Sequence, residues 1–463
     1  MEDPAQKKST FYGWFIVILL FYTLIHTAGN GFYGISVYLP RFMETLNCEA
    51  ASLQLAAVVW ALAFGLSSPL IGAWIQRYGA RKVFVTGAMI GGLVMALMST
   101  ITQVWHLYLI NVVAGVAAGA TILLPAQTVI TLWFDKYRGR AMALVMMGIG
   151  VGGFVVPWLI TTLLLLFGRW VSGAGNAADA SLLLRLFTGW GGELTPWRGA
   201  LRAGAVLNYV IVVPPLLLWL RNKPSDVGQF VDGVQPAGAA GAETPLLSGV
   251  SAKRALRSST FRLVAAVYLL QLCTMSGIQL NAQIFAEQQA AYTMDMAWRF
   301  MGYALIVTIP TRFLFGRLCD RFDPKYLMAG AGVFLLGGAL TLWVGVLRLG
   351  WTGYAPILIF ALLQGVGIGG NAVTLPILVG RCFGERDFGK ILGFVMMGFA
   401  VGVIFGAPVM SKIFDETGSF ELAFVYATVL LTVAVVLALL IRTKALQAEF
   451  STGVEPETAA ADA

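Results

Sequence analysis

Long apolar runs separated by short polar breaks fill most of the sequence. A helix needs about 20 predominantly apolar residues to cross the hydrocarbon core of a bilayer. Twelve runs meet this requirement, and they begin near Trp14, Leu53, Val83, Trp105, Ala141, Leu201, Phe261, Trp298, Tyr326, Tyr354, Ile391 and Glu421. Because lipid offers no partners to backbone polar groups, such runs form helices. The pattern predicts an all-α polytopic membrane protein with twelve transmembrane helices.

The composition agrees with this pattern, since 58% of the residues are hydrophobic and 12% are charged. Such a balance excludes a water-soluble domain. The net charge of +8 does not indicate nucleic acid as a partner, because the basic residues form short clusters between apolar runs and make no extended basic face.

The basic clusters indicate the orientation in the bilayer instead. With the N-terminus in the cytoplasm, most of the 31 Lys and Arg residues fall in cytoplasmic loops and tails, as the positive-inside rule requires. The opposite orientation would place Arg77, Arg140 and Arg321 outside. We therefore expect a multi-pass protein of the bacterial cell inner membrane with both termini in the cytoplasm.

A segment rich in Ala, Gly, Pro, Ser and charge divides the predicted helices six and six. We expect an N-terminal six-helix bundle over residues 1–220 and a cytoplasmic linker over 221–260. We also expect a C-terminal six-helix bundle over 261–443 and a flexible cytoplasmic tail over 444–463. This division predicts two pseudo-repeated halves, as in transporters built from structural repeats.

Two sets of matching residues support the repeat. One set, at the start of the fifth predicted span, is Gly139, Arg140, Val145, Met146, Met147, Gly148 and Gly152, and it recurs as Gly389, Lys390, Val395, Met396, Met397, Gly398 and Gly402. In the other set, Gly72, Gln76 and Arg77 correspond to Gly316, Asp320 and Arg321. The glycines of the fifth span also favour close helix packing.

The loop containing Gly316, Asp320 and Arg321, followed by a basic turn, resembles the signature loop of the major facilitator superfamily. The resemblance implies a conformational latch in which the Asp meets a helix N-terminus and a nearby Arg. The latch residues implied here are Asp320, Arg321, Arg77, Gly72 and Gly316. Gln76 replaces the acidic residue in the first copy and cannot supply its charge. The alternative is that both loops act only as positive-inside anchors.

Further motifs resemble the branch of monocarboxylate transporters and oxalate:formate antiporters over roughly residues 11–444. They are Gly13-Trp14, Trp133-Phe134, Arg138-Gly139, Trp197-Arg198 and the segment 221–228. The resemblance implies a carboxylate-binding arginine at Arg312. Many members of this branch carry an acidic or amide residue one turn earlier, where this chain has Thr308, which cannot titrate usefully.

Arg312 also stands out on physical grounds, as the only Lys or Arg well inside a predicted span. At 1.5 Å per residue it lies about 12 Å from Asp320, near the middle of a core about 30 Å thick. Placing it there costs about 2.5–3.5 kcal/mol, and no Asp or Glu lies comparably deep. The planar guanidinium matches a carboxylate, which predicts an anionic substrate. The alternative is an arginine that snorkels and bonds backbone carbonyls.

Polar side chains on several spans predict a central wet site. Tyr22, His26, Asn30 and Tyr33 stand at successive steps of four, four and three and share one face of the first predicted helix. The substrate-binding candidates are Arg312, Thr308, Asn30, Tyr33, Gln279, Asn281, Asn371 and Gln364. His26 is the proton-coupling candidate, because imidazole titrates in the physiological range. The alternative for His26 and the other polar residues is an interhelical hydrogen bond, and for the tyrosines it is an aromatic belt at the membrane interface.

A secondary transporter competes with a channel, a membrane enzyme and a transport-like sensor. The repeat favours the transporter, since the chain has no filter-like repeated loop, no His and carboxylate cluster and no phosphate-binding Gly-Lys-Ser/Thr loop. We expect no enzyme activity, no cofactor and no metal; Cys48, Cys273, Cys319 and Cys382 show no spacing for a metal or a disulfide framework.

We therefore expect a monomeric secondary active transporter that carries a small organic anion by alternating access with proton symport. The cargo expected is a monocarboxylate or related acid, including an acid or lactone from aromatic degradation. The alternatives are an anion exchanger of the oxalate:formate type, and a drug or sugar transporter. Arg312 favours the anion, because a sugar site does not need an arginine there and a cation exporter would be expected to hold an acidic residue.

Overall fold

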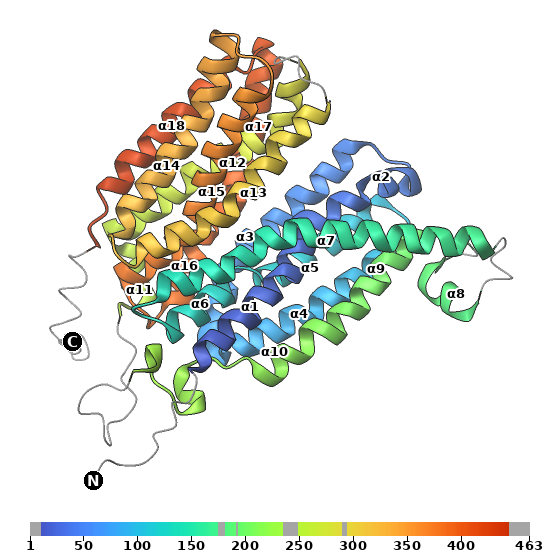
Figure 1. Cartoon of the computed structure of the whole chain (residues 1–463), viewed down its shortest axis with the longest axis horizontal. Helices are drawn as coiled ribbons and strands as arrows, with labels where there is room; N and C mark the ends of the chain where they lie inside the picture. The colour runs from blue at the N-terminus through green and yellow to red at the C-terminus, as the bar shows by residue number, and fades with distance from the viewer. Residues whose placement is uncertain (1–10, 175–180, 191–192, 235–248, 289–293, 444–463) are drawn as a thin grey trace, which may run out of the picture. The chain divides into compact units, whose positions relative to one another are not determined.

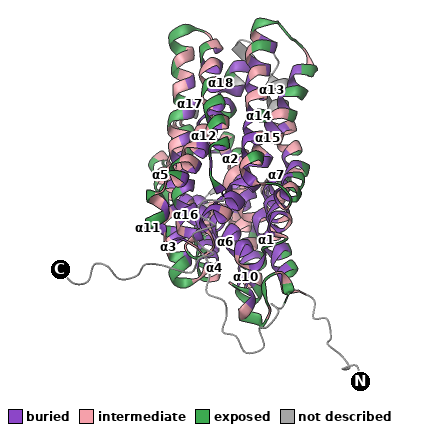
Figure 2. Cartoon of the chain, turned by 90° about the vertical axis from the view of Figure 1, so that its left-hand side faces the viewer, coloured by how far each residue is buried: buried purple, intermediate pink, exposed green. Residues whose placement is uncertain are grey.

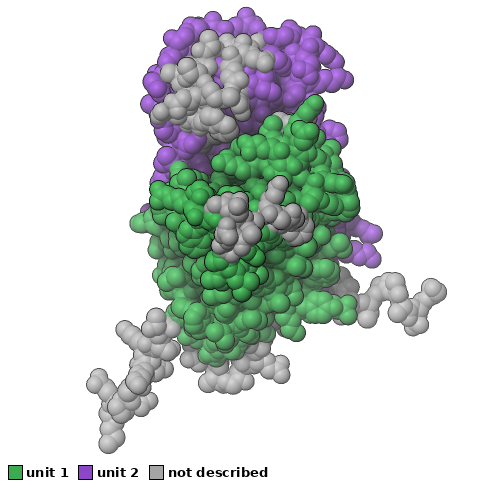
Figure 3. Space-filling view, turned by 90° about the vertical axis from the view of Figure 1, so that its right-hand side faces the viewer, with its two compact units in different colours: residues 1–244, 312–320 green, residues 245–311, 321–463 purple. Residues whose placement is uncertain are grey.

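The computed structural model describes residues 11–174, 181–190, 193–234, 249–288 and 294–443 of the chain, and these are almost entirely helical (Figure 1). Contacts divide the chain into two units (Figure 3). The first unit is Met1–Thr244 with Arg312–Asp320, and the second unit is Pro245–Thr311 with Arg321–Ala463. The division falls inside the predicted linker, while the short segment that carries Arg312 groups with the first unit.

The residues up to 234 form helices, short π-helical or 3₁₀ segments (η) and two strands of two residues each. Their bounds are α1 Tyr12–Ala28, η1 Gly29–Gly34, α2 Ile35–Leu46, α3 Ala50–Tyr78, α4 Ala80–Met98, α5 Val104–Gly119, α6 Leu124–Trp133, α7 Arg138–Ala174, α8 Leu182–Thr188, β1 Gly189–Trp190, β2 Glu193–Leu194, α9 Pro196–Leu207, η2 Asn208–Val212, α10 Val213–Trp219, η3 Pro224–Val227 and η4 Val231–Gly233. The two strands pair in antiparallel fashion.

The rest of the described chain is helical apart from its connections. The elements are α11 Ala252–Arg257, α12 Ser259–Gln288, α13 Met294–Cys319, α14 Pro324–Leu340, η5 Thr341–Arg348, α15 Tyr354–Phe383, α16 Phe388–Met396, α17 Gly398–Thr417 and α18 Glu421–Leu439. The predicted tail 444–463 lies outside the described residues, as does the middle of the predicted linker. The described parts of that linker contain η3, η4 and α11, so they are not uniformly irregular.

Eleven helical stretches in the described part of the chain are long and apolar enough to cross a membrane. Each coincides with a predicted run, to within a few residues at its start. The remaining predicted run, near Trp298, corresponds to α13, which has 26 residues but is not among the eleven. Arg312 and Arg317 lower the mean hydropathy of α13. The prediction of an all-α membrane protein is confirmed, and the small β1–β2 pair and an isolated β-bridge between Gly249 and Gly384 depart from it within the described residues.

Burial and exposure alternate around these helices (Figure 2). Large apolar side chains remain exposed on the outer faces of the spans, among them Leu70, Trp158 and Val210. A soluble protein would cover such residues, whereas lipid is a suitable environment for them. The exposed apolar faces therefore indicate where the helices meet the bilayer.

Glycines let helices approach closely within each unit. In the first unit, a Cβ on Gly148 or Gly152 of α7 would collide with the backbone of α1 at Phe21 and Ile25. In the second unit, a Cβ on Gly402 of α17 would press on α12 at Leu272. Gly152 and Gly402 are matching members of the repeated motif, so one sequence feature makes the same kind of helix contact in both units.

Candidate functional site

Arg312 is almost completely buried, with 4% of its surface exposed. Its Nη1 donates a hydrogen bond to the backbone oxygen of Met146 in α7 at 2.5 Å. Its Nε is buried and has no hydrogen-bond partner among the described residues. The same part of the chain supplies no carboxylate that forms an ion pair with Arg312. A hydrogen bond to a backbone carbonyl is the contact that the snorkelling alternative predicts. This single bond leaves most of the five N–H donors of the guanidinium unused.

The side chain of Tyr33 also interacts with Arg312. It lies in η1, and its phenol is close enough to the guanidinium for an electrostatic interaction. The sequence placed Tyr33 on the face of Tyr22, His26 and Asn30 by assuming regular helical spacing. This assumption is wrong at η1, because a π-helical turn contains more residues than an α-helical turn and shifts the positions that follow.

His26 and Asn30 lie on the same stretch of the first span but differ in their partners. The amide of Asn30 donates to the backbone oxygen of His26 at 2.9 Å. The Nδ1 atom of His26 is buried and has no hydrogen-bond partner among the described residues. His26 therefore keeps a ring nitrogen available for a proton or a ligand.

Three of the predicted binding residues lie on α13 and α12 of the second unit. Thr308 is buried, and its hydroxyl donates to the backbone oxygen of Leu305 in its own helix at 2.7 Å. Asn281 donates to the oxygen of Ala407 at 3.2 Å and accepts from Ser411 at 2.7 Å, which ties α12 to α17. Gln279 is exposed. Asn281 thus makes the interhelical bond that the alternative predicts, whereas the bond of Thr308 stays within its own helix.

The two candidates on α15 have unsatisfied polar atoms. Asn371 donates to Oε1 of Gln271 at 2.8 Å, while its own Oδ1 is buried without a partner among the described residues. Gln364 is 2% exposed, and neither its amide nitrogen nor its oxygen has a hydrogen-bond partner there. Because buried polar groups are normally satisfied, these atoms are suited to bind water or a ligand.

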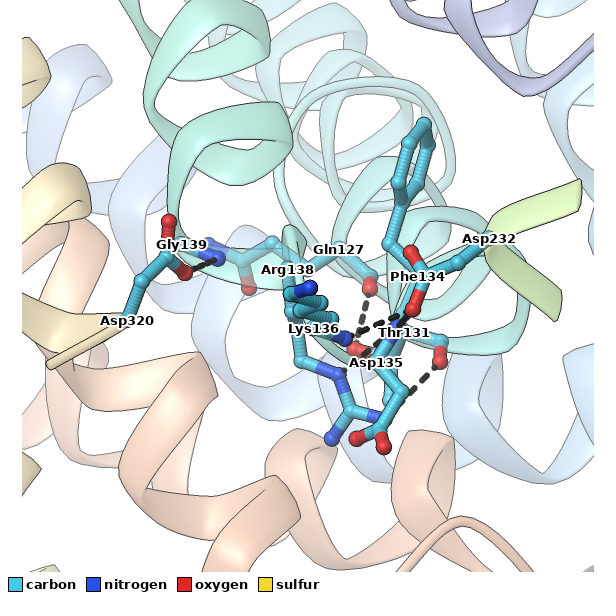
Figure 4. A network of polar contacts seen from close by, with 9 residues as sticks. All are labelled: Gln127, Thr131, Phe134, Asp135, Lys136, Arg138, Gly139, Asp232 and Asp320. Atoms are coloured by element: carbon cyan, nitrogen blue, oxygen red, sulfur yellow. Dashed lines mark hydrogen bonds and ion pairs between the residues drawn. The ribbon is translucent and has the colours of Figure 1, made fainter. Parts of the chain in front are cut away.

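Asp320 contacts the beginning of α7 (Figure 4). Its Oδ1 accepts a hydrogen bond from the backbone N–H of Gly139 at 2.8 Å, and its Oδ2 lies 3.2 Å from Nε of Arg140. A carboxylate is stabilised at a helix N-terminus by the free N–H groups and the helix dipole. This is the kind of contact that the signature loop implies.

Glycine makes this contact sterically feasible. A Cβ on Gly316 would collide with the backbone oxygen of Gly139 and with Ala143, and a Cβ on Gly139 would collide with Gly316 and Asp320. Both positions therefore require glycine for α7 and the end of α13 to approach.

The other implied latch residues are placed differently. Gly72 is buried in α3, Arg77 is exposed beside the ring of Tyr78, and Arg321 is exposed. The arginine paired with Asp320 is Arg140, which the sequence identified as a repeated residue and an orientation signal but not as a latch residue. Its position directly after Gly139 in that repeat was the available signal.

A second residue that the sequence did not identify is Asp232 of η4. Its Oδ2 accepts from the backbone N–H of Asp135 at 3.2 Å and of Lys136 at 2.7 Å (Figure 4). Asp232 adopts a left-handed backbone conformation, with φ at 57°, which an Asp tolerates better than most residues. It thereby holds the turn that leads into α7.

Arg138 stabilises the same turn through hydrogen bonds to backbone oxygens. It is buried, and its guanidinium donates to the backbone oxygens of Phe134 at 2.9 Å and Thr131 at 3.2 Å. These bonds join the last turn of α6 to the first turn of α7, immediately before the N–H group that Asp320 contacts.

Comparison with known proteins places this arrangement in a family. The family model of the Major Facilitator Superfamily matches residues 19–355 and 295–461. Monocarboxylate transporter 13 of Bos taurus is 24% identical over 440 residues, which covers 92% of this chain and 88% of the relative. The gentisate transporter of Corynebacterium glutamicum is 30% identical over 206 residues, which covers 40% of this chain and 44% of the relative.

Solved structures show the same fold. The human organic anion transporter MFSD10 superposes with a TM-score of 0.62 at 16% identity, covering 92% of this chain and 99% of that one. The transporter FucP in its outward conformation gives a TM-score of 0.63 at 15% identity, covering 93% and 98%. With eleven apolar spans and a family match along most of its length, the chain is a multi-pass membrane transporter, and not an enzyme, of the Major Facilitator Superfamily.

Proposed function

We propose that the protein carries a small organic anion by secondary active transport and that Arg312 binds the carboxylate of the cargo. The observation that carries the proposal is a buried guanidinium whose Nε has no hydrogen-bond partner among the described residues. A charged group at that depth needs an offsetting interaction, and a carboxylate is the best match for its geometry.

The donor pattern of Arg312 supports a two-pronged contact. Nη1 is occupied by the oxygen of Met146, whereas Nε is buried without a hydrogen-bond partner among the described residues. Nε and Nη2 together form one side of the guanidinium fork, and a carboxylate can accept from both at once. Tyr33, which interacts with Arg312, is suited to contact the same ligand. Asn30, Gln279, Asn281, Thr308, Gln364 and Asn371 remain secondary binding candidates, with Gln364 and Asn371 favoured by their unpartnered atoms.

The relatives support this class of cargo through their names, which refer to a monocarboxylate, to gentisate and to an organic anion. Within the class, the proposal includes aromatic acids and lactones. Proton symport through His26 is the preferred coupling, because its Nδ1 is buried without a partner among the described residues. Exchange of one anion for another is the competing mechanism. We also propose that the protein is a monomer of a bacterial inner membrane. The basic loops support an orientation with both termini in the cytoplasm.

Uptake into proteoliposomes tests the proposal. A panel of labelled monocarboxylates, dicarboxylates and aromatic acids is offered with and without an imposed pH gradient, beside a sugar and a lipophilic cation. We expect wild-type protein to accumulate at least one acid and neither of the other two compounds.

Substitutions on α13 then test the role of Arg312. Arg312→Lys keeps the charge and loses the fork, so uptake of that acid should fall at least tenfold, and Arg312→Gln should abolish it. Arg317→Lys and Arg317→Gln, at an exposed arginine of the same helix, are the matched controls and should transport normally. Near-normal uptake by both Arg312 variants at equal protein content would refute the anion site.

A further inference from the structure

The short helix α8 is buried on one side and exposes apolar side chains on the other. Figure 1 shows it beside the far end of α7. Leu184 and Thr188 are buried, and the ring of Phe187 stacks on Phe167 of α7 with the ring centres 5.9 Å apart. On the other side Leu182, Leu183 and Leu186 are 83%, 67% and 65% exposed.

These leucines are exposed although α8 is firmly held in place by hydrogen bonds. Nη1 of Arg202 in α9 donates to the backbone oxygens of Leu186 at 2.7 Å, Phe187 at 3.1 Å and Gly189 at 3.1 Å. These are carbonyl groups at the C-terminal end of α8, which a cation stabilises. The backbone of Thr195, just before α9, also donates to the oxygen of Thr188 at 2.9 Å.

The same contacts fix the depth of α8. Arg202 belongs to the second turn of the span Pro196–Trp219, so α8 lies level with the beginning of a membrane-spanning stretch. The neighbouring span α7 has 37 residues, or about 56 Å of helix, which exceeds the thickness of a bilayer with its headgroups. The end of α7, against which α8 packs, therefore reaches the boundary between hydrocarbon and water.

The surroundings of α8 identify what meets its exposed leucines. The adjacent part of α7 exposes Leu165, Leu166 and Trp170, which continue the lipid-facing surface of the span, and tryptophan favours the membrane interface. Arg169 and Arg185 are exposed in the same region. An apolar face bordered by arginines fits a lipid surface with anionic headgroups.

We propose that α8 lies in the plane of the membrane interface at this end of the first unit. Leu182, Leu183 and Leu186 enter the upper acyl region, while Arg169 contacts lipid phosphate groups. The proposal does not depend on the cargo. It assigns to α8 the role of an anchor for α7 and α9 in one leaflet.

An environment-sensitive fluorophore on Leu183→Cys tests the apolar half of the proposal. The four native cysteines are free, and Cys48 alone among them is not buried, so Cys48→Ser gives the background protein. The full-length protein is labelled with a nitrobenzoxadiazole maleimide and placed in vesicles of phosphatidylcholine and phosphatidylglycerol. The background protein without an added cysteine must remain unlabelled.

Two reference positions calibrate the signal: Leu70→Cys, 63% exposed on the span α3, and Val234→Cys, 68% exposed after η4. We expect the label at position 183 to emit at shorter wavelength than at 234 and to be quenched by nitroxide lipids but little by iodide. Emission and iodide quenching equal to those at 234 would place α8 in water. Blue-shifted emission that nitroxide lipids do not quench would show a covering protein, a second copy included. Either result overturns the proposal.

Arg169 is tested by thermal unfolding of unlabelled protein in the same vesicles. Replacing phosphatidylcholine by phosphatidylglycerol should raise the Tm of the wild type by several degrees, and Arg169→Gln should reduce that rise. Arg262→Gln, at an exposed arginine near the start of α12, is the control for a general loss of charge. An unchanged lipid effect in the Arg169 variant would show that this residue does not contact the headgroups.

Discussion

Buried polar side chains in this protein differ in whether the helices satisfy them. Thr308 bonds to the backbone of its own helix, whereas Asn281 bonds across helices to Ala407 and Ser411, and interhelical bonds of this kind contribute about 0.6–2 kcal/mol each. Arg312 and Gln364 keep polar atoms without partners in the described chain, which costs stability unless a ligand or water supplies them. This difference separates structural residues from candidates for binding.

His26 belongs to the second group, and its role is testable. We predict that His26→Gln reduces uptake driven by an inward proton gradient at least tenfold, because Gln can hydrogen-bond but cannot carry a proton. Exchange against preloaded substrate should survive. The measurement compares both modes in the same proteoliposomes, with His106→Gln, at the start of the fourth predicted span, as the control. If both modes persist unchanged in His26→Gln, His26 is structural and the coupling proposal fails.

At this scale the sequence predicted residue types better than it predicted their contacts. Arg312 could be identified because a lone charge within an apolar run is conspicuous. Asn281 could not be distinguished from Asn371, since both are amides in apolar spans and only the neighbouring helices decide which is satisfied. The binding assignments themselves remain predictions.

Among the helices, α7 receives the most elaborate support at its N-terminus. Asp320 accepts from the N–H group of Gly139, Arg138 joins α7 to α6, and Asp232 holds the turn before it. A helix end fixed by three polar groups is a suitable place to control the rate of a conformational change. The support is electrostatic and therefore reversible.

Asp320→Asn should slow transport while leaving substrate affinity within about twofold of wild type. Asn can still accept from Gly139, but it loses the charge that pairs with Arg140 and with the helix dipole. Turnover is measured by flux and affinity by tryptophan fluorescence, with the exposed Asp415→Asn as control. A large loss of affinity at unchanged turnover would contradict the latch role.

Asp232→Ala should loosen the turn between α6 and α7. The N–H groups of Asp135 and Lys136 lose their acceptor, a change worth about 1–2 kcal/mol at a capping position. Hydrogen exchange of residues 135–140 should become at least tenfold faster, as followed by mass spectrometry. Val234→Ala, at an exposed position nearby, should leave exchange unaltered. Equal exchange in the two variants would show that Asp232 does not hold the turn.

Element positions were predictable because membrane helices are long and lipid enforces an apolar surface along them. The starts of eleven spans agree with the described helices, whereas η1 and the β1–β2 pair could not be foreseen. Nothing in the apolar pattern distinguishes a π-helical turn from an α-helical one. Asp232 was missed for a related reason, because it acts from a linker whose composition suggests irregular chain.

Across the whole molecule, the repeat is visible in packing as well as in sequence. Gly152 and Gly402 each allow one helix to lie against the backbone of another within their own unit. The exact limits of the two predicted halves remain a prediction, because the contacts assign Arg312–Asp320 to the first unit. The assignment of these nine residues depends on tertiary contacts, which cannot be derived from composition.

Replacing these glycines should destabilise both units. We predict that Gly152→Ala and Gly402→Ala each lower the Tm by several degrees, because the added Cβ meets backbone or side chain with no room to move. Gly91→Ala in α4 is the matched control: its Cβ would meet nothing within 4 Å, and Ala favours a helix by about 1 kcal/mol. Thermal unfolding in detergent checks all three. A Gly91 variant as unstable as the others would remove the packing explanation.

The π-helical turn η1 has a consequence for insertions and deletions. Such a turn accommodates about one extra residue without rotating the helix that follows it, so deleting Gly31 should give a regular helix through the first span with α2 in nearly the same orientation. Tyr38 and Phe42, both buried on α2, would then keep their site beside Trp197. Sequences that align here with a one-residue gap should therefore need no compensating changes at the positions of Tyr38, Phe42 and Trp197.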